Sequence, residues 1–353
     1  MTSGPSRVLV TGGAGFIGSN FIRWLLDAQP DVQVINLDAL TYAGNLESLE
    51  DVAEAHGPKV DARYCFIHGD VRDVELVRAV LRDKAPDCVV HLAAESHVDR
   101  SIMGPSVFVD TNIRGTLTLL EACRGELAAG QRALRFIQVS TDEVYGSLNP
   151  DDPAFTETTP LEPNSPYSAS KAGADLLVRS YVETFGFPAL ITRCSNNYGP
   201  YQFPEKLIPL MITRALVDRP LPVYGDGLNV RDWLHVDDHA SALWAVATKG
   251  RVGEVYNIGG GAEVTNITVV RQLLRCLGKP ESLIQYVKDR AGHDRRYAMN
   301  TDRICGELGW RPSHRFETGL AATVAWYLGH RTWWERVLNE AYRASNALYL
   351  KNL

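Results

Sequence analysis

The chain has 353 residues, of which 45% are hydrophobic and 22% are charged, values typical of a globular protein with one large or two smaller domains. Its 42 acidic side chains against 36 lysines and arginines give a net charge of −6, which argues against nonspecific binding to nucleic acid. It has no apolar run near the roughly 20 residues that cross a bilayer, and its six cysteines lack metal-type spacing. We therefore expect a cytoplasmic enzyme with reduced thiols and no metal.

The first expected unit is a strand, a glycine-rich turn and a helix. Arg7–Thr11 is an apolar run, and helical spacing begins at Ser19. Between them, Gly12, Gly15 and Gly18 would let the backbone approach a pyrophosphate at the helix N-terminus. A flexible turn without a ligand is the alternative, and the strand and helix on either side disfavour it.

Asp38 ends the second predicted strand, Gln33–Asp38. It lies about 20 residues after the glycines, where a carboxylate binds the ribose hydroxyls of a dinucleotide and repels a 2′-phosphate. Ala39 and Leu40 follow it instead of an arginine, which favours NAD over NADP. The alternative is a solvated aspartate at a strand end.

Strands and helical runs continue to alternate, with further strands expected from residues 63, 87 and 135. This alternation predicts an α/β fold with a Rossmann-type, doubly wound parallel sheet. His68, His91 and His97 lack partners at metal-ligand spacing, so we expect structural or substrate-lining roles for them.

The proposed reaction centre follows the strand that begins at Arg135. This strand runs into Thr141, Asp142 and Glu143, and ligands bind at the carboxyl ends of strands in such sheets. Two neighbouring carboxyl groups can divide into an acid and a base, because repulsion and burial raise the pKa of one.

A proline-rich loop over residues 149–166 leads to a helix that opens with Tyr167 and Lys171. Their four-residue spacing puts phenol and ammonium on one helix face. A cationic neighbour favours phenolate, so Tyr167 is a candidate base near neutral pH. An ordinary exposed first turn is the alternative.

The second half is expected to assemble a smaller substrate domain. Strands are predicted over 190–193 and 255–258, and Pro222–Gly227 has the composition of a hairpin. Asn266 is expected to cap a helix. We expect residues 1–195 to form the NAD-binding domain and residues 196–353 an interleaved, substrate-binding C-terminal domain. Trp326, Trp333 and Trp334 suggest packing or an oligomer surface.

These features resemble the extended short-chain dehydrogenase/reductase superfamily and, within it, the dTDP-glucose 4,6-dehydratases. The resemblance covers nearly the whole chain and rests on the glycine pattern, on Tyr167 with Lys171, and on the segments 41–46, 91–100, 140–146, 196–206 and 292–297. Adjacent Asp142 and Glu143 are its specific part, because related epimerases usually lack both acids. Ala291 stands where proline is common in the family.

The resemblance implies roles for many residues. Cofactor contacts are expected from Gly12, Gly15, Phe16, Ile17, Gly18, Asp38, Leu40, Thr41, Asp70, Val71, Leu92, Ala93, Ala94, Ser96, Thr111, Tyr167, Lys171 and Asn197. Substrate contacts are expected from Ser96, Thr141, Asn196, Lys206, Leu207, Pro222, Tyr224, Arg231, Asn266, Arg290, His293, Arg296 and Tyr297. The family also implies a homodimer formed through helices of the cofactor domain.

The implied reaction is the dehydration of dTDP-glucose to its 4-keto-6-deoxy product. Tyr167, helped by Thr141 and Lys171, would take the proton from the hydroxyl at carbon 4, Glu143 the proton from carbon 5, and protonated Asp142 would release the hydroxyl at carbon 6. One alternative is a nucleotide-sugar 4-epimerase, which needs no elimination acids. Another is a dinucleotide-binding regulator without catalytic activity.

Overall fold

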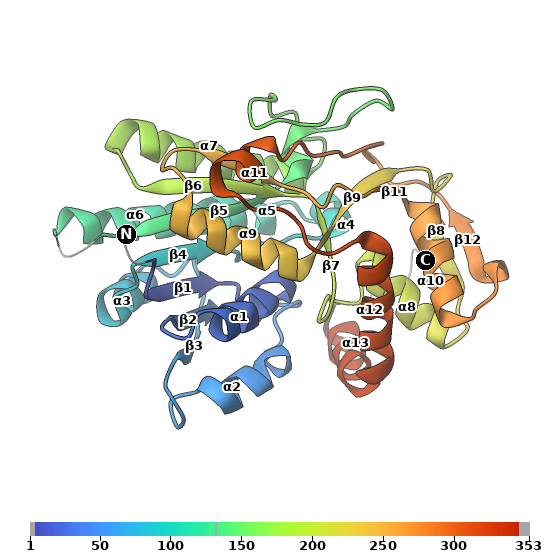
Figure 1. Cartoon of the computed structure of the whole chain (residues 1–353), viewed down its shortest axis with the longest axis horizontal. Helices are drawn as coiled ribbons and strands as arrows, with labels where there is room; N and C mark the ends of the chain where they lie inside the picture. Colours follow the sequence, from blue (N-terminus) through green and yellow to red (C-terminus); the bar gives the residue numbers. More distant parts are fainter. Residues whose placement is uncertain (1–3, 131–132, 346–353) are drawn as a thin grey trace.

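The computed structural model describes residues 4–130 and 133–345, and its largest sheet has seven parallel strands in the order β10-β6-β5-β4-β1-β2-β3 (Figure 1). The strands are β1 (Arg7–Thr11), β2 (Gln33–Asp38), β3 (Tyr64–His68), β4 (Cys88–His91), β5 (Arg135–Thr141), β6 (Ala189–Cys194) and β10 (Val255–Ile258). This order confirms the predicted doubly wound fold. The chain begins in the middle of the sheet, so its direction of winding reverses between β1 and β4, where such folds bind ligands.

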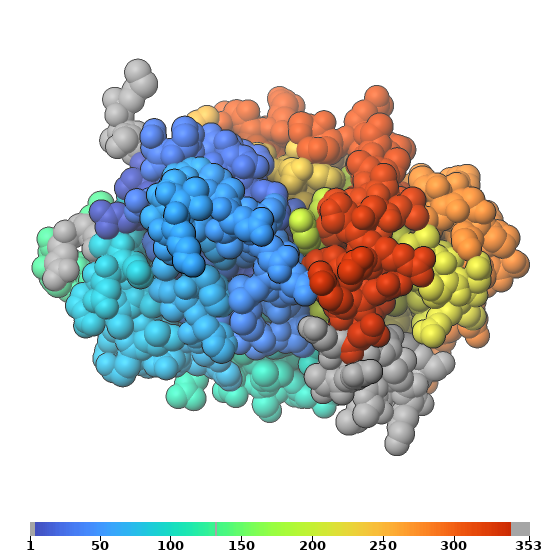
Figure 2. Space-filling view, turned by 90° about the horizontal axis from the view of Figure 1, so that it is seen from below, coloured from blue at the N-terminus to red at the C-terminus, as the bar shows by residue number. Residues whose placement is uncertain are grey.

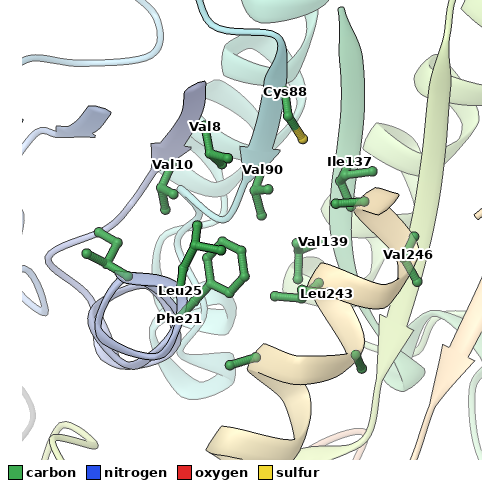
Figure 3. Packing of buried hydrophobic residues seen from close by; sticks show 14 of the residues in the cluster. Val8, Val10, Phe21, Leu25, Cys88, Val90, Ile137, Val139, Leu243 and Val246 are labelled. Carbon is green, nitrogen blue, oxygen red and sulfur yellow. The ribbon is translucent and has the colours of Figure 1, made fainter. Parts of the chain in front are cut away.

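Helices cover both faces of this sheet because its strands are apolar on both sides. Val8 and Val10 of β1 pack with Phe21 and Leu25, whereas Leu9 joins the opposite core (Figure 3). The first face carries α1 (Phe16–Ala28), α9 (Val236–Lys249) and α11 (Asp302–Leu308). The second carries α3 (Val74–Lys84), α6 (Gly115–Ala128) and α7 (Pro166–Phe185).

Shorter segments connect these layers. They are η1 (Leu46–Leu49), α2 (Glu50–His56), α4 (Val98–Met103), α5 (Ser106–Phe108), η2 (Val109–Arg114) and η3 (Asp142–Tyr145). Among the helices of the described ranges, none combines the length and apolarity that a membrane span requires.

A smaller lobe follows from the second half of the chain. It contains a three-stranded sheet in the order β11-β9-β7 and a parallel pair, β12 and β8. Its strands are β7 (Asn196–Tyr198), β8 (Leu221–Tyr224), β9 (Val230–His235), β11 (Glu263–Thr265) and β12 (Ile284–Val287). Its helices are α8 (Leu207–Leu216), α10 (Asn266–Leu277), η4 (Glu281–Leu283), α12 (Phe316–Gly329) and α13 (Arg331–Ser345). Trp333 and Trp334 are buried in its core, with Trp326 packed against them.

The two parts interleave along the sequence. Strand β10 and helices α9 and α11 come after residue 196, yet they pack in the layers of the large sheet. Figure 2 shows the blue-to-cyan N-terminal residues and the yellow-to-red residues of the smaller lobe side by side. A division at residue 195 remains a proposal, with these segments returning to the first domain.

Two local predictions were wrong. Helix α1 begins at Phe16 instead of Ser19, because Gly15 is its N-cap and Gly18 fits within the first turn. Pro222–Gly227 is not a hairpin, since β8 pairs in parallel with β12 and Gly225 and Gly227 turn the chain toward β9 with positive φ angles.

We expect Leu25→Ala to lower the free energy of unfolding by about 2–5 kcal/mol, because it leaves a cavity in a close-packed core. Leu25 is 0% exposed between α1 and the sheet. Leu328 of α12 is 52% exposed, so Leu328→Ala should cost less than about 1 kcal/mol. Urea unfolding followed by circular dichroism measures both, and equal losses would contradict this packing.

Candidate active site

The end of β5 delivers three functional side chains into the crevice. Strand β5 lies between β4 and β6, and η3 begins directly after it. The Thr141 hydroxyl caps this turn by accepting a hydrogen bond from the Glu143 N–H at 3.2 Å. This local geometry buries Asp142, which is 1% exposed, and leaves Glu143 at the wall of the cavity.

Helix α7 presents Tyr167 and Lys171 to the same place. Ser165 and Ser168 form a capping box and Pro166 occupies the first turn, so the sequence determines where the helix starts. The Lys171 ammonium donates to the carbonyl of Val139 in β5 at 2.7 Å. The five residues of the proposed reaction centre, Thr141, Asp142, Glu143, Tyr167 and Lys171, all line one cavity.

The two carboxyl groups have different electrostatic surroundings. Burial, Glu143 and Asp232 raise the pKa of Asp142 well above its ordinary value. Burial also raises the pKa of Glu143, but Lys206, Arg290 and Arg231 oppose that rise. Asp142 is therefore the better proton donor and Glu143 the better base, a choice that the sequence left to resemblance.

Burial of Tyr167 opposes the deprotonation that its cationic neighbour was expected to favour. Burial raises its pKa well above the usual value, and Glu143, Cys194 and Asp142 raise it further, although the Thr141 hydroxyl lowers it. Burial also lowers the pKa of Lys171. Desolvation thus outweighs the cationic neighbour and favours the neutral phenol in the protein alone.

A cavity of about 330 Å³ runs along the carboxyl ends of β1, β2 and β4. It is lined by all the predicted cofactor residues except Leu40. Leu40 instead turns the chain with a φ of 50°, and its N–H donates to Asp38 at 2.7 Å. Its contribution is therefore to orient the Asp38 carboxylate.

The glycine turn leaves room for a dinucleotide. At Gly12, φ is 73° and a β-carbon would lie 2.6 Å from the Ala93 backbone nitrogen, so any side chain is excluded. Gly15 is the N-cap of α1 without a side-chain cap, which leaves helix N–H groups available to an anion. Asp38 accepts from the Ala14 N–H at 2.9 Å and lines the same cavity. These residues fit a dinucleotide whose ribose carries a free 2′-hydroxyl instead of a 2′-phosphate.

A second cavity of about 270 Å³ lies between the smaller lobe and the segment 97–103 that includes α4. It is lined by most of the predicted substrate residues: Asn196, Lys206, Leu207, Pro222, Tyr224, Arg231, Asn266, Arg290, His293 and Tyr297. Ser96 and Thr141 line the first cavity instead. Glu143, Asn196 and Lys206 line both, so the two cavities meet beside the proposed base.

Buried polar groups in the second cavity are prepared for a ligand. Among the described residues, the side-chain oxygens of Asn196 and Asn266 are buried without a hydrogen-bond partner. Thr265, not Asn266, caps α10, which leaves the Asn266 amide facing the cavity. Arg231 lies over the Tyr297 ring at 4.3 Å and donates to the Asp294 carbonyl at 3.1 Å, so its guanidinium is held in place.

Arg296 does not line either cavity, so its predicted substrate contact remains a prediction. The segment is extended and bridged to Val230, so neighbouring side chains point in opposite directions. Tyr297 faces the cavity, whereas Arg296 pairs with Glu263 at 2.7 Å and donates to the Asp152 carbonyl at 2.8 Å. Arg296 therefore fastens the proline-rich loop.

Several residues of the site were not identified from sequence. Glu205 lines both cavities, and burial raises its pKa to about 7. Next to it, at 3.7 Å, lies His97, for which a structural or substrate-lining role was expected and which lines the second cavity. Asp232 adjoins Arg231 and raises the pKa of Asp142. Glu205 lies within a segment that carries the family resemblance, which was the available signal.

Comparison with known proteins agrees with this geometry. The family model described as GDP-mannose 4,6 dehydratase matches residues 9–323. The dTDP-glucose 4,6-dehydratase of Xanthomonas campestris is 55% identical over 348 residues, covering 95% of this chain and 97% of the relative.

Solved structures extend the comparison. DesIV, a dTDP-glucose 4,6-dehydratase from Streptomyces venezuelae crystallised with NAD bound, has a TM-score of 0.87 and 53% identity, covering 94% of this chain and 99% of that one. A UDP-glucose 4-epimerase from Thermotoga maritima has a TM-score of 0.81 but 29% identity, and the match covers 92% of this chain and 99% of the epimerase. By these matches the chain belongs to the dTDP-glucose 4,6-dehydratase family.

Proposed function

We propose that this protein is an NAD-dependent dehydratase that converts dTDP-glucose to dTDP-4-keto-6-deoxyglucose. The observation that carries the proposal is the pair Asp142 and Glu143, which lie where the dinucleotide cavity meets the second cavity. Their unequal surroundings provide an acid beside a base. Elimination of water needs both, and simple oxidation of a sugar needs neither.

When bound, NAD would supply the hydride acceptor for sugar carbon 4 and the hydride donor for carbon 6. The positive nicotinamide would also lower the pKa of the nearby Tyr167, which burial raises in the protein alone. Tyr167, with Thr141 beside it and Lys171 behind it, then takes the proton from the hydroxyl at carbon 4. The phenol is thus a base only when the cofactor is present.

Elimination follows because the new ketone acidifies the proton on carbon 5. Glu143 removes that proton, and Asp142 donates a proton to the hydroxyl leaving carbon 6, so water departs. After the hydride reaches carbon 6, Glu143 returns its proton to carbon 5. The proton gained by Tyr167 balances the one lost by Asp142.

The substrate diphosphate is assigned to the cationic side of the second cavity. Arg231 and Arg290 line it, and Lys206 lines it at the N-terminus of α8, where a helix favours an anion. Tyr224, with Arg290 over its ring at 5.7 Å, is proposed to flank the nucleobase of the substrate.

A nucleotide-sugar 4-epimerase is the second candidate, favoured by the structural likeness to the Thermotoga enzyme. The two acids argue for dehydration. Incubation with dTDP-, UDP-, GDP- and CDP-linked hexoses, followed by mass spectrometry, separates the two activities. Loss of water supports the dehydratase, and an isomer of unchanged mass supports the epimerase.

We also propose that the protein is a cytoplasmic homodimer. Leu117 on α6 and Leu176 and Phe185 on α7 are exposed and apolar, and these helices pack side by side. Such a face is typical of a twofold interface. The six cysteines are free thiols, which suits a reducing compartment.

Glu143→Gln and Asp142→Asn should each lower the rate of water loss by about 100-fold or more, because each removes a proton-transfer group. Oxidation at carbon 4 should persist, so reduced cofactor would accumulate on the protein. Product mass and cofactor absorbance measure the two steps. Glu162→Gln, in the exposed part of the loop, serves as control. Normal turnover in both variants would rule out the two-acid scheme.

Tyr167→Phe should suppress the oxidation itself by about 100-fold or more, because no group then takes the proton from the hydroxyl at carbon 4. The formation of reduced cofactor in a single turnover measures this step. Tyr286→Phe, at a side chain that is 54% exposed, should leave it unchanged. If reduced cofactor still formed at the normal rate, Tyr167 would not be the base.

Leu176→Arg should shift the protein from dimer toward monomer, because it places a charge on the apolar face of α7. Light scattering after size-exclusion chromatography gives the molar mass. Leu328→Arg is a matched control, because Leu328 is a comparably exposed leucine on α12. A dimer that survives Leu176→Arg unchanged would locate the interface elsewhere.

A further inference from the structure

Near Tyr167, the proposed base of the oxidation step, lies a buried ion pair that the mechanism above does not use. Asp175 of α7 and Arg193 of β6 are joined at 2.9 Å, with side chains 1% and 6% exposed. Burying two charges is costly unless they are paired and hydrogen-bonded. The pair lies against the reaction centre, because Asp175 follows Lys171 by one helical turn.

Asp175 is the carboxylate whose charge acts on Lys171. Burial lowers the pKa of Lys171, and Asp175 opposes that fall more than Cys194 does. The groups whose charges interact with Lys171 are Asp175 on α7, Cys194 on β6 and His91 on β4, and Tyr167, Asp142 and Glu143 line the same cavity. Asp175 is the carboxylate whose charge favours the ammonium of Lys171, so it supplies its counter-charge.

Arg193 in turn holds Asp175 in place. Its Nε donates to the carboxylate of Asp175, and its Nη1 donates to the Tyr145 hydroxyl at 2.9 Å. That hydroxyl donates to the side-chain oxygen of Asn257 in β10 at 2.8 Å. Burial opposes the charge of Arg193, but Asp175 and Tyr145 outweigh it and raise the pKa.

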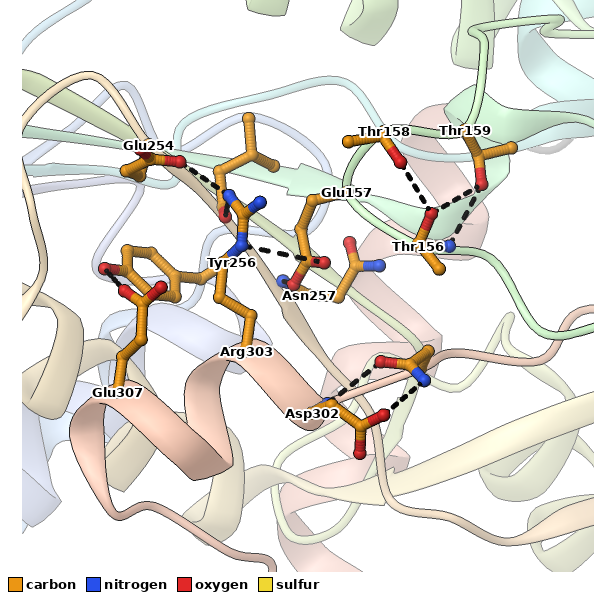
Figure 4. A network of polar contacts seen from close by, with 12 residues as sticks. Thr156, Glu157, Thr158, Thr159, Glu254, Tyr256, Asn257, Asp302, Arg303 and Glu307 are labelled. Atoms are coloured by element: carbon orange, nitrogen blue, oxygen red, sulfur yellow. Dashed lines mark hydrogen bonds and ion pairs between the residues drawn. The ribbon is translucent and has the colours of Figure 1, made fainter.

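Asn257 connects this network to the proline-rich loop. Its side chain donates to the Phe155 carbonyl at 3.1 Å, and its N–H donates to Glu157 at 3.1 Å. Figure 4 shows Glu157 also facing Arg303 of α11. The ion pair is therefore fixed from four elements, α7, β6, η3 and β10, which gives Asp175 a single position relative to Lys171.

We propose that Asp175 and Arg193 are positioning residues for the oxidation step, Asp175 keeping Lys171 charged beside Tyr167, and Arg193 fixing Asp175. This inference rests on the proposed function of Tyr167 as the base. Without the carboxylate, Lys171 would lose its proton more readily, because burial already disfavours its charge. Tyr167 would then lose the cation that favours its deprotonated form.

The test is Asp175→Asn, which keeps the shape of the side chain and removes its charge. We expect the midpoint of the single-turnover oxidation rate against pH to move up by about one unit, with about a tenfold loss below the midpoint. Asp175→Glu should restore the wild-type midpoint. An unchanged profile in Asp175→Asn would overturn the proposal, as would a shift of equal size in Tyr145→Phe, which removes one hydrogen bond of the network and no charge.

A second variant controls for any folding defect of Asp175→Asn, which leaves the Arg193 charge buried without its partner. The double variant Asp175→Asn/Arg193→Gln removes both charges and should shift the midpoint in the same direction. An unchanged midpoint in the folded double variant would also overturn the proposal. Wild-type protein is assayed alongside for loss of water from dTDP-glucose. Failure there counts against the proposed function, whereas a normal wild type with unshifted variants counts against the positioning role alone.

Discussion

The desolvation of two adjacent carboxyl groups is the constraint on which this active site depends. Asp142 and Glu143 leave a strand that is buried on both faces, and burial raises both pKa values. Three cations oppose that rise at Glu143: Lys206, Arg231 and Arg290. All three come from the second half of the chain, so the smaller lobe contributes to the difference in pKa between the two carboxyl groups.

The same principle governs the other side of the crevice. A phenol and an ammonium lie deep enough that burial disfavours the charged form of each. The fold compensates with charges placed behind them, from Asp175 and Arg193, and leaves the cofactor side open for the positive ring. Each buried charged group is thus stabilised by an oppositely charged neighbour, Lys171 by Asp175 and Asp175 by Arg193.

The interleaved chain explains how these groups keep their positions. Strand β10 belongs to the large sheet, yet it follows β7, β8 and β9 of the smaller lobe. Asn257 on β10 holds the proline-rich loop at Phe155, and Arg296, whose segment is bridged to β9, holds it at Asp152. The first part of this loop is therefore fixed both by the large sheet and by the smaller lobe.

Local patterns in the sequence determined the parallel sheet, the glycine turn and the segment that carries Thr141, Asp142 and Glu143, because strand and helix periodicity depend on near neighbours. Periodicity placed α1 three residues late and could not separate Arg296 from Tyr297, since a side chain's direction depends on what its strand pairs with. The protonation of Asp142, the neutral phenol and the pairing of Asp175 with Arg193 were decided by tertiary structure alone. Desolvation and charge pairing act between groups that only folding brings together, and the sequence carries no local trace of how deeply each will be buried.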